Sequence, residues 1–274
     1  MMRTYRNIQR RQVALAGLWL LSGAVLAVRF ATAQTPAEPA ERQVSWKQVV
    51  PNILHDQKPI WLFPVHAVQG QHWKPALAVV LTTAGLVALD PHDTPYFHRT
   101  ASFSSFNRAL TGRNTTIGMT AVPGAFYLVA LARHHHDDQS SALLAGEAAA
   151  DSELLALVMK DVDRRVRPTD IPPGSDFSHT WFKSHGTLLN GENAAFPSGH
   201  VIGAFALATV FAERYGPRRN EQGTSRRRWV PWVAYGLASL VGFSRITQQS
   251  HFPSDVFAGA ALGYFIAHGV VLQH

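Results

Sequence analysis

The chain has 274 residues, of which 46% are hydrophobic and only 16% are charged. This charged fraction is low for a soluble protein and favours a membrane protein or an apolar helical fold. Cysteine is absent, which excludes disulfides, thiolate metal ligands and a cysteine nucleophile. The formal net charge of +7 falls to +2 without the first 33 residues, which hold five arginines and no acid. Nucleic acid is therefore not an expected partner.

The first 33 residues have the order of a secretory signal. Four arginines precede the apolar run 13–28, and the small residues of Ala31-Thr32-Ala33 follow it. This order is typical of a signal peptide, although the length of the run also suits an uncleaved signal anchor. We expect residues 1–33 to be one of the two, with the arginines holding the amino end inside the cytoplasm and the following chain outside it.

Residues 34–74 are expected to form a tether and then an interfacial segment. The stretch 34–42 is rich in proline, alanine and glutamate and has nothing to bury, as in a flexible linker. Trp46, Trp61 and Trp73 follow among prolines, which suits a segment at a membrane–water boundary. Burial of these tryptophans in an ordinary core is the alternative interpretation.

Six apolar runs without strand-like alternation follow, and each is predicted to be a helix. The runs are 75–89, 116–132, 142–159, 201–212, 229–243 and 256–272. The predicted fold class is all-α, with a six-helix core bundle in a phosphatase-type domain of residues 75–274. Five of the runs have 12 to 17 residues, whereas a membrane span needs about 20. A membrane-embedded bundle is expected, and a compact soluble bundle is the alternative.

Charged residues distinguish one run from the other five. Three acidic residues interrupt the third run: Glu147, Asp151 and Glu153. This helix is therefore expected to pack inside the protein or to lie at its surface. If the other runs span a membrane, the loop 213–228 lies on the cytoplasmic side, where its six arginines follow the positive-inside rule. A solvated charged loop is the alternative. In the last run, Gly259 and Gly263 form a G-x-x-x-G pattern that permits another helix to approach closely.

The first candidate site element is Pro197-Ser198-Gly199-His200, at the start of the apolar run 201–212. The first turn of a helix has unpaired N–H groups and a partial positive charge, so it can bind an anion. Ser198 can cap this helix, Gly199 lets a ligand come near the backbone, and His200 can point at whatever is bound. An ordinary capped helix is the alternative.

The second element lies at the end of the acidic helix, where Lys160 and Arg167 are seven residues apart. Seven residues make about two helical turns, which predicts that both cations lie on one face, about 10 Å apart. Pro168 disfavours helix at Arg167 and permits this arginine to turn away from the axis. Two such cations fit a phosphate. Basic residues that merely complement the helix dipole are the alternative.

The third element, from Ser244 to Asp255, lies between the last two runs and contains Arg245 and His251. Its Phe-Pro-Ser sequence at 252–254 repeats that at 196–198, which predicts a second helix start. Asp255, four residues after His251, can accept the N–H of one ring nitrogen and leave the lone pair of the other exposed. His251 is therefore a candidate nucleophile, and a histidine that caps a turn is the alternative.

Together the elements read K-x6-R-P, P-S-G-H and S-R-x5-H-x3-D, with 28 residues in the first gap and 43 in the second. All eleven fixed positions are present. From residue 75 onward the chain thus resembles the phosphatidic acid phosphatase type 2 / vanadium haloperoxidase superfamily, in its membrane-associated phosphatase branch. The resemblance implies an all-helical fold and a pocket that works without a metal or other cofactor. Vanadate would then be an inhibitor that mimics phosphate.

By motif position, the resemblance also implies a role for each site residue. His251 would attack phosphorus and form a phosphohistidine, and Asp255 would orient His251. His200 would protonate the departing alkoxide and later activate water. The phosphate oxygens would be held by a cradle of cations and one helix start: Lys160, Arg167, Arg245, the Ser198 hydroxyl and the Gly199 N–H.

Two further groups of histidines need a separate interpretation. The run His134-His135-His136-Asp137-Asp138 has metal-binding residue types but lies in a short helix connection, and we expect no metal there. A loop between the first two motifs contains aromatic and basic side chains that suit a lid over the pocket: His179, Trp181, Phe182, Lys183 and His185. A plain surface loop is the alternative.

The expected function is that of an exported, membrane-associated phosphatase with its site facing the periplasm. Its expected partners are membrane lipid and either a phosphorylated lipid or a small phosphomonoester. A soluble periplasmic acid phosphatase is one alternative, and a vanadate-dependent haloperoxidase is another. A non-catalytic protein that senses or carries a phosphorylated lipid is the alternative from a different class. The sequence indicates neither the substrate nor the oligomeric state.

Overall fold

The computed structural model describes residues 42–98, 102–172, 174–184, 194–217 and 227–274. The chain divides into two compact units, Met1–Thr35 and Pro36–His274, and all described residues belong to the second unit. The predicted signal segment and most of the tether lie outside the described residues, as does 218–226 of the arginine-rich loop.

The described residues are helical and contain no named strand, so the predicted all-α class is confirmed. The α-helices are α2 (Val49–Val68), α3 (Trp73–His98), α4 (Ser104–Ala109), α5 (Gly112–Ala132), α6 (His136–Asp163), α7 (Gly199–Tyr215), α8 (Val230–Thr247) and α9 (Pro253–Leu272). All six predicted runs are present as α3 and α5 to α9. Their observed helices extend beyond the apolar runs because polar residues continue several of them. Helices α2 and α4 were not predicted.

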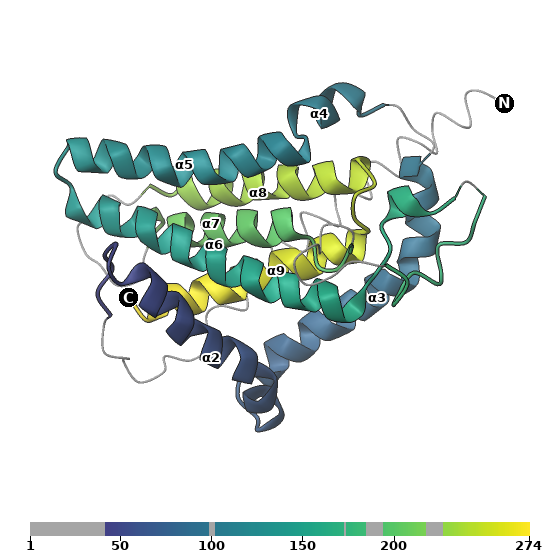
Figure 1. Ribbon diagram of the computed structural model, residues 1–274, viewed down its shortest axis with the longest axis horizontal. Helices are drawn as coiled ribbons and strands as arrows, with labels where there is room; N and C mark the ends of the chain where they lie inside the picture. The colour runs from purple at the N-terminus through teal and green to yellow at the C-terminus, as the bar shows by residue number, and fades with distance from the viewer. Residues whose placement is uncertain (1–41, 99–101, 173, 185–193, 218–226) are drawn as a thin grey trace. The chain divides into compact units, whose positions relative to one another are not determined.

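Helix α7 lies at the centre of the packing and contacts α6, α8 and α9 most extensively (Figure 1). Its small and apolar residues are buried on nearly every side, from Val201 to Ala212. An α-helix that is apolar all round is stable only where other elements cover it. The residues before α7 are therefore held against three neighbouring helices, and these residues carry the P-S-G-H motif.

The G-x-x-x-G pattern of α9 forms the contact with α7. A methyl group added at Gly259 would lie 2.9 Å from the backbone oxygen of Ser198, and one at Gly263 would overlap the backbone oxygen of Ile202. The predicted close helix approach is thus confirmed, and the approaching helix is α7 of the same chain. This contact brings the start of α9, which follows His251, beside the start of α7.

By length and composition, three of the described helices are apolar enough to cross a membrane. These candidate spans are Trp73–Phe97 in α3, Gly112–Ala132 in α5 and Pro253–Leu272 in α9. Large apolar side chains on α3 and α5 are exposed, including those of Leu81 and Leu128. Such faces are typical of helices in contact with lipid. These helices therefore indicate a membrane protein.

The three tryptophans of the predicted interfacial segment are exposed, by 65% at Trp46, 43% at Trp61 and 48% at Trp73. The interpretation of ordinary core aromatics is therefore wrong. Most of this segment forms α2, which packs on α6 and α3. The expectation of a free tether also fails at its last residue, because the Arg42 side chain pairs with Asp56 at 2.5 Å.

Helix α6 was expected either to pack inside the protein or to lie at its surface, and the side that carries Glu147 and Asp151 is buried. Glu147 accepts a hydrogen bond from Asn52 of α2 at 3.3 Å, and Asp151 accepts one from Gln57 at 2.7 Å. Burial raises the pKa of both carboxyl groups to about 7. These acids therefore attach α2 to α6 through polar contacts rather than facing solvent.

Candidate active site

The P-S-G-H motif forms the start of α7, with Ser198 as N-cap and Gly199 as the first helical residue. Ser198 is fully buried, yet its hydroxyl makes no capping hydrogen bond. Among the described residues, its Oγ atom has no hydrogen-bond partner at all. A buried hydroxyl is normally hydrogen-bonded. An anion bound at this helix start would supply the acceptor that Ser198 lacks.

Lys160 reaches this helix start from α6. A methyl group added at Gly199 would lie 3.2 Å from Lys160 Nζ and 3.1 Å from Glu153 Oε2. Glycine is therefore the residue that lets the ammonium group come close to the α7 backbone. Burial lowers the pKa of Lys160, and the carboxylate of Glu153 opposes this shift.

The expectation that Lys160 and Arg167 share one helix face is wrong. Helix α6 ends at Asp163, and Arg164 adopts the left-handed conformation with φ of 46°. The chain then runs extended to Arg167, which precedes the 3-10 helix Pro168–Asp170. The two cations still act on each other, because the positive charge of Arg167 contributes to the lowered pKa of Lys160. The end of α6 and the left-handed Arg164, rather than helical spacing, therefore set how these two residues lie.

His251 is buried just before α9, and its Nδ1 atom lies 2.6 Å from the backbone oxygen of Ala195. A carbonyl oxygen can only accept, so Nδ1 carries the proton and Nε2 keeps its lone pair in the neutral ring. Asp255, the predicted orienting residue, lies farther away, with Oδ2 at 3.8 Å from Nδ1. Its carboxylate also accepts the N–H of Phe252 at 2.8 Å, which caps the start of α9.

His200 and Arg245 meet at the first turn of α5. His200 Nε2 lies 3.1 Å from both the backbone oxygen of Gly112 and the hydroxyl of Thr116. Arg245 is bonded to the backbone oxygen of Leu110 through Nη2, which also donates to Thr115 at 3.3 Å. Leu110 and the start of α5 therefore lie against both of these predicted site residues.

The structure brings the predicted site residues into one electrostatic cluster. His200 interacts with Arg245, His251 and Lys160, and His251 interacts in turn with Lys160 and Arg167. Burial lowers the pKa of His251, and Asp255 opposes this shift. Burial, followed by the charge of Arg245, lowers the pKa of His200 to about 4. At neutral pH, and without a bound anion, both imidazoles are therefore neutral.

This shift predicts a contribution of His200 to acid stability. The folded pKa of about 4 lies below the ordinary value of 6.5, so the unfolded chain binds more protons between these values. The stability associated with His200 is complete above about pH 6.5 and is lost as the pH falls towards 4. As the pH falls from 7 to 4, we expect the free energy of unfolding of a His200→Gln variant to increase relative to that of wild type by up to about 3 kcal/mol, because the variant lacks this loss.

Thermal unfolding in detergent micelles across this pH range measures the effect as a difference between the two proteins. Carboxyl groups with raised pKa values, such as Asp163 at about 7, change the stability in the opposite direction as the pH falls. Both proteins contain these groups, so their effect cancels in the difference. Parallel pH curves for His200→Gln and wild type would contradict the expected shift.

One predicted lid residue of the loop between the first two motifs, Trp181, packs beside the P-S-G-H motif. The ring of Trp181 packs edge-on against Phe196, with centroids 5.3 Å apart. Phe182 and Lys183 are exposed, and His185 lies outside the described residues. In the histidine run, His135 Nδ1 lies 3.3 Å from Asp138 Oδ2. Among the described residues, no group of three or more metal-ligating side chains is placed to hold an ion.

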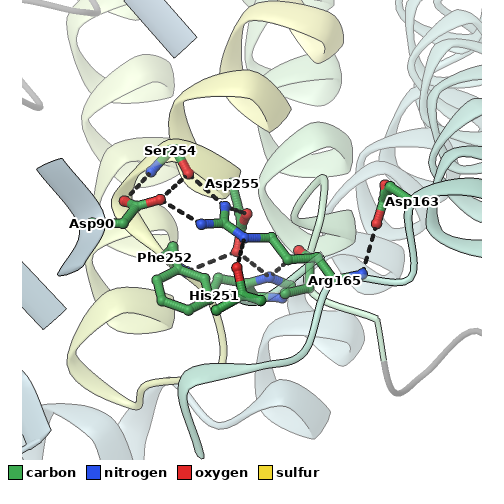
Figure 2. Close-up of polar contacts among 9 residues, drawn as sticks. Asp90, Asp163, Arg165, His251, Phe252, Ser254 and Asp255 are labelled. Atoms are coloured by element: carbon green, nitrogen blue, oxygen red, sulfur yellow. Dashed lines mark hydrogen bonds and ion pairs between the residues drawn. The ribbon is translucent and has the colours of Figure 1, made fainter. Parts of the chain in front are cut away.

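Arg165 was not predicted as a site residue, although it lies inside the first motif. It occupies one of the six variable positions between Lys160 and Arg167. In the structure it is 1% exposed and pairs with Asp255 at 2.5 Å (Figure 2). The sequence gave no sign that Arg165 differs from the four other lysines and arginines between 160 and 183.

Comparison with known proteins supports the motif pattern. A family model described as PAP2 superfamily matches residues 141–274, which include all three motifs. Lipid A 1-phosphatase of Porphyromonas gingivalis is 38% identical over 90 residues, covering 33% of this chain and 18% of the relative. Lipid A 1-phosphatase of Rhizobium etli is 34% identical over 116 residues, covering 41% of each chain. Phosphatidylglycerophosphatase B of Bacillus subtilis is 30% identical over 120 residues, covering 42% of this chain and 51% of the relative.

The matched region spans between about a fifth and a half of the length of these relatives. No solved structure matches this chain. The family match, the three motifs and the helical fold agree with one another in residues 141–274. This carboxy-terminal part of the chain, residues 141–274, is thus similar to the PAP2 superfamily in sequence.

Proposed function

We propose that this protein is a metal-independent phosphatase that hydrolyses lipid phosphates through a phosphohistidine at His251. The observation that carries the proposal is the arrangement around the α7 start. A buried, unpartnered Ser198 hydroxyl lies at a helix start that Lys160 approaches, in one electrostatic cluster with two neutral imidazoles. Phosphoryl transfer depends mainly on positioning and on neutralising charge, and these groups can supply both.

In the proposed first step, the Nε2 lone pair of His251 attacks phosphorus and the P–O bond to the leaving alcohol breaks. His200 gives a proton to the departing alkoxide. In the second step, His200 takes a proton from water, the resulting hydroxide attacks phosphorus, and the P–N bond breaks to release phosphate. The hydrogen bond from Nδ1 to Ala195 supports this role, because it keeps Nε2 unprotonated in the neutral ring.

His200 must be protonated to act as the acid, yet burial lowers its pKa to about 4 in the unliganded protein. A bound phosphate dianion would raise this pKa, because an opposite charge nearby favours the protonated ring. Substrate binding would therefore supply the proton-carrying form at the time when it is needed.

Two observations support a lipid substrate over a soluble one. His200 contacts the first turn of α5, and α5 is a candidate membrane span with exposed apolar side chains. A leaving group that departs beside His200 would thus be next to a lipid-facing helix. The similar proteins of Porphyromonas gingivalis and Bacillus subtilis are also named as phosphatases of lipids. We further propose that the protein lies in an inner membrane, with this site facing the periplasm.

The test is phosphate release by the purified full chain in detergent micelles with EDTA. The panel holds lipid A, phosphatidylglycerophosphate, diacylglycerol pyrophosphate and p-nitrophenyl phosphate. We expect turnover of at least one lipid phosphate in EDTA and competitive inhibition by vanadate. A complete requirement for an added divalent metal would contradict the proposed mechanism. Peroxide-dependent bromide oxidation with vanadate, without phosphate release, would instead indicate a haloperoxidase.

A further inference from the structure

Arg165 forms a buried clamp between two carboxylates that come from distant helices (Figure 2). Its Nη2 atom lies 2.6 Å from Asp90 Oδ2 of α3, and its Nη1 atom lies 2.5 Å from Asp255 Oδ1 of α9. All three side chains are at most 1% exposed. Charge-assisted bonds of this length in a dry environment are strong and define geometry.

The remaining surfaces of the Arg165 guanidinium are also occupied. Its carbon atom lies 4.5 Å from the ring centroid of Trp181 and 4.0 Å from that of Phe252. Its Nε atom donates to the hydroxyl of Thr180 at 3.1 Å. A planar cation packed between rings and carboxylates has one orientation, which lysine cannot reproduce.

The backbone of Arg165 reaches His251 through Ala195. Its carbonyl oxygen accepts the N–H of Ala195 at 2.7 Å, and the carbonyl oxygen of Ala195 accepts the Nδ1 proton of His251 at 2.6 Å. Arg165 therefore holds both groups that are near His251 Nδ1: Asp255 through its side chain and Ala195 through its backbone.

Asp90 completes the clamp and also holds the start of α9. Its carboxylate accepts the Ser254 hydroxyl at 2.5 Å and the Ser254 N–H at 3.3 Å. Ser254 Oγ in turn accepts a bond from Arg165 Nη1 at 2.6 Å. Asp90 thus connects α3, which lies outside the matched region 141–274, to the segment that carries His251.

We propose that Arg165 and Asp90 are positioning residues that fix Asp255 and the His251 ring for nucleophilic attack, so that α3 is a functional part of the active site. The inference rests on the proposed phosphohistidine function. It goes beyond the three motifs, because neither residue is one of their fixed positions.

The charges of the clamp distinguish this role from a purely structural one. Removing the cation of Arg165 leaves the negative charge of Asp255 uncompensated, which favours the protonated form of His251. Removing the negative charge of Asp90 has the opposite effect. The other charged or titratable groups that act on His251 stay unchanged in these variants: Lys160, Arg167, His200 and Asp255.

The experiment compares Arg165→Gln, Arg165→Lys and Asp90→Asn with wild type, using the full chain and the best lipid phosphate of the panel. Arg164→Gln is the matched control, because Arg164 is adjacent and exposed and its Nε bonds only to the backbone of Asp161. The measurements are kcat, KM, the pH dependence of kcat/KM and the thermal unfolding midpoint.

We expect Arg165→Gln to lower kcat on the order of 100-fold with KM little changed, because the nucleophile is misplaced while the phosphate cradle remains. The acid limb of kcat/KM should move to higher pH in Arg165→Gln and to lower pH in Asp90→Asn. Arg165→Lys should keep the acid limb near that of wild type, because the charge is retained, while kcat is only partly recovered. Arg164→Gln should match wild type in every measurement.

If Arg165→Gln and Asp90→Asn both keep the wild-type kcat and an unshifted acid limb, the positioning role is wrong. This result would leave the proposed function standing. If Arg165→Gln does not fold, Asp90→Asn still decides the question, since asparagine keeps the shape of aspartate and the acid limb must move to lower pH. Absence of phosphate release by the wild-type chain would overturn the proposed function itself, so the two failures are distinguishable.

Discussion

Substituting alanine for His251 is expected to lower phosphate release on the order of 10⁴-fold or more. In the proposed mechanism this imidazole forms the covalent intermediate, and loss of a nucleophile that works with a partner base removes most of the catalysed rate. Binding should persist, because the cradle at the start of α7 is unchanged. Steady-state turnover of a lipid phosphate measures the loss, and inhibition by inorganic phosphate measures the binding.

A pre-steady-state experiment with p-nitrophenyl phosphate separates the roles of the two histidines. Nitrophenolate leaves without a proton, so His200→Ala should still release one equivalent in a rapid burst and then stall as the phosphohistidine accumulates. His251→Ala should show no burst. In steady state with an alkyl phosphate, His200→Ala should lose about 10²–10⁴-fold.

Replacement of His135 is the matched control, because this histidine is 59% exposed and lies at the other end of α6. His135→Ala should behave as wild type. A normal burst in His251→Ala would assign the nucleophile to another residue. If the His251→Ala variant released no phosphate but kept its full physiological function, the result would favour a protein that only carries or senses the phosphorylated lipid.

Substituting alanine for Gly263 is expected to destabilise the fold by about 3 kcal/mol, at the upper end of overpacking effects. The added methyl group would overlap the carbonyl oxygen of Ile202 and lie 3.1 Å from the backbone nitrogen of Ala206. Both are backbone atoms of α7 and cannot rotate away, so α7 and α9 must separate. Activity should fall as well, because these helices carry the start of the cradle and the His251 segment.

Gly269→Ala is the matched control in the same helix. A methyl group at Gly269 meets nothing within 4 Å, so this variant should be neutral or more stable by up to about 1 kcal/mol. Thermal unfolding midpoints of both variants in detergent micelles test the comparison. Equal midpoints for Gly263→Ala and Gly269→Ala would contradict the close α7–α9 contact.

The six helices could be predicted from the sequence because each contains a long, mostly apolar run, and hydrophobicity is a local property. Their ends were less predictable, since polar residues continue several helices where neighbouring helices cover them. Helix α2 was missed for the same reason. Two prolines lie inside it, at Pro59 and Pro64, and its polar residues bond to the buried acids of α6 rather than to water.

Part of the candidate site could be predicted from the sequence, and part could not. The motif residues could be named from the sequence because their types and spacing repeat a known pattern. Helical spacing gave the wrong geometry for Lys160 and Arg167, because α6 ends at Asp163 and Arg164 adopts the left-handed conformation. The sequence gives little indication of a left-handed residue at position 164, because glycine and asparagine favour that conformation and arginine does not.

The sequence by itself determined six of the helices, the three motifs and therefore the chemistry to be expected. Only the tertiary structure decided which groups hold the reactive ring. The oxygen that accepts the Nδ1 proton of His251 belongs to a residue 56 positions away, and Asp90 lies 75 positions from Arg165. Such pairs have no local pattern, because helix packing alone sets which distant backbone and side-chain groups become buried together.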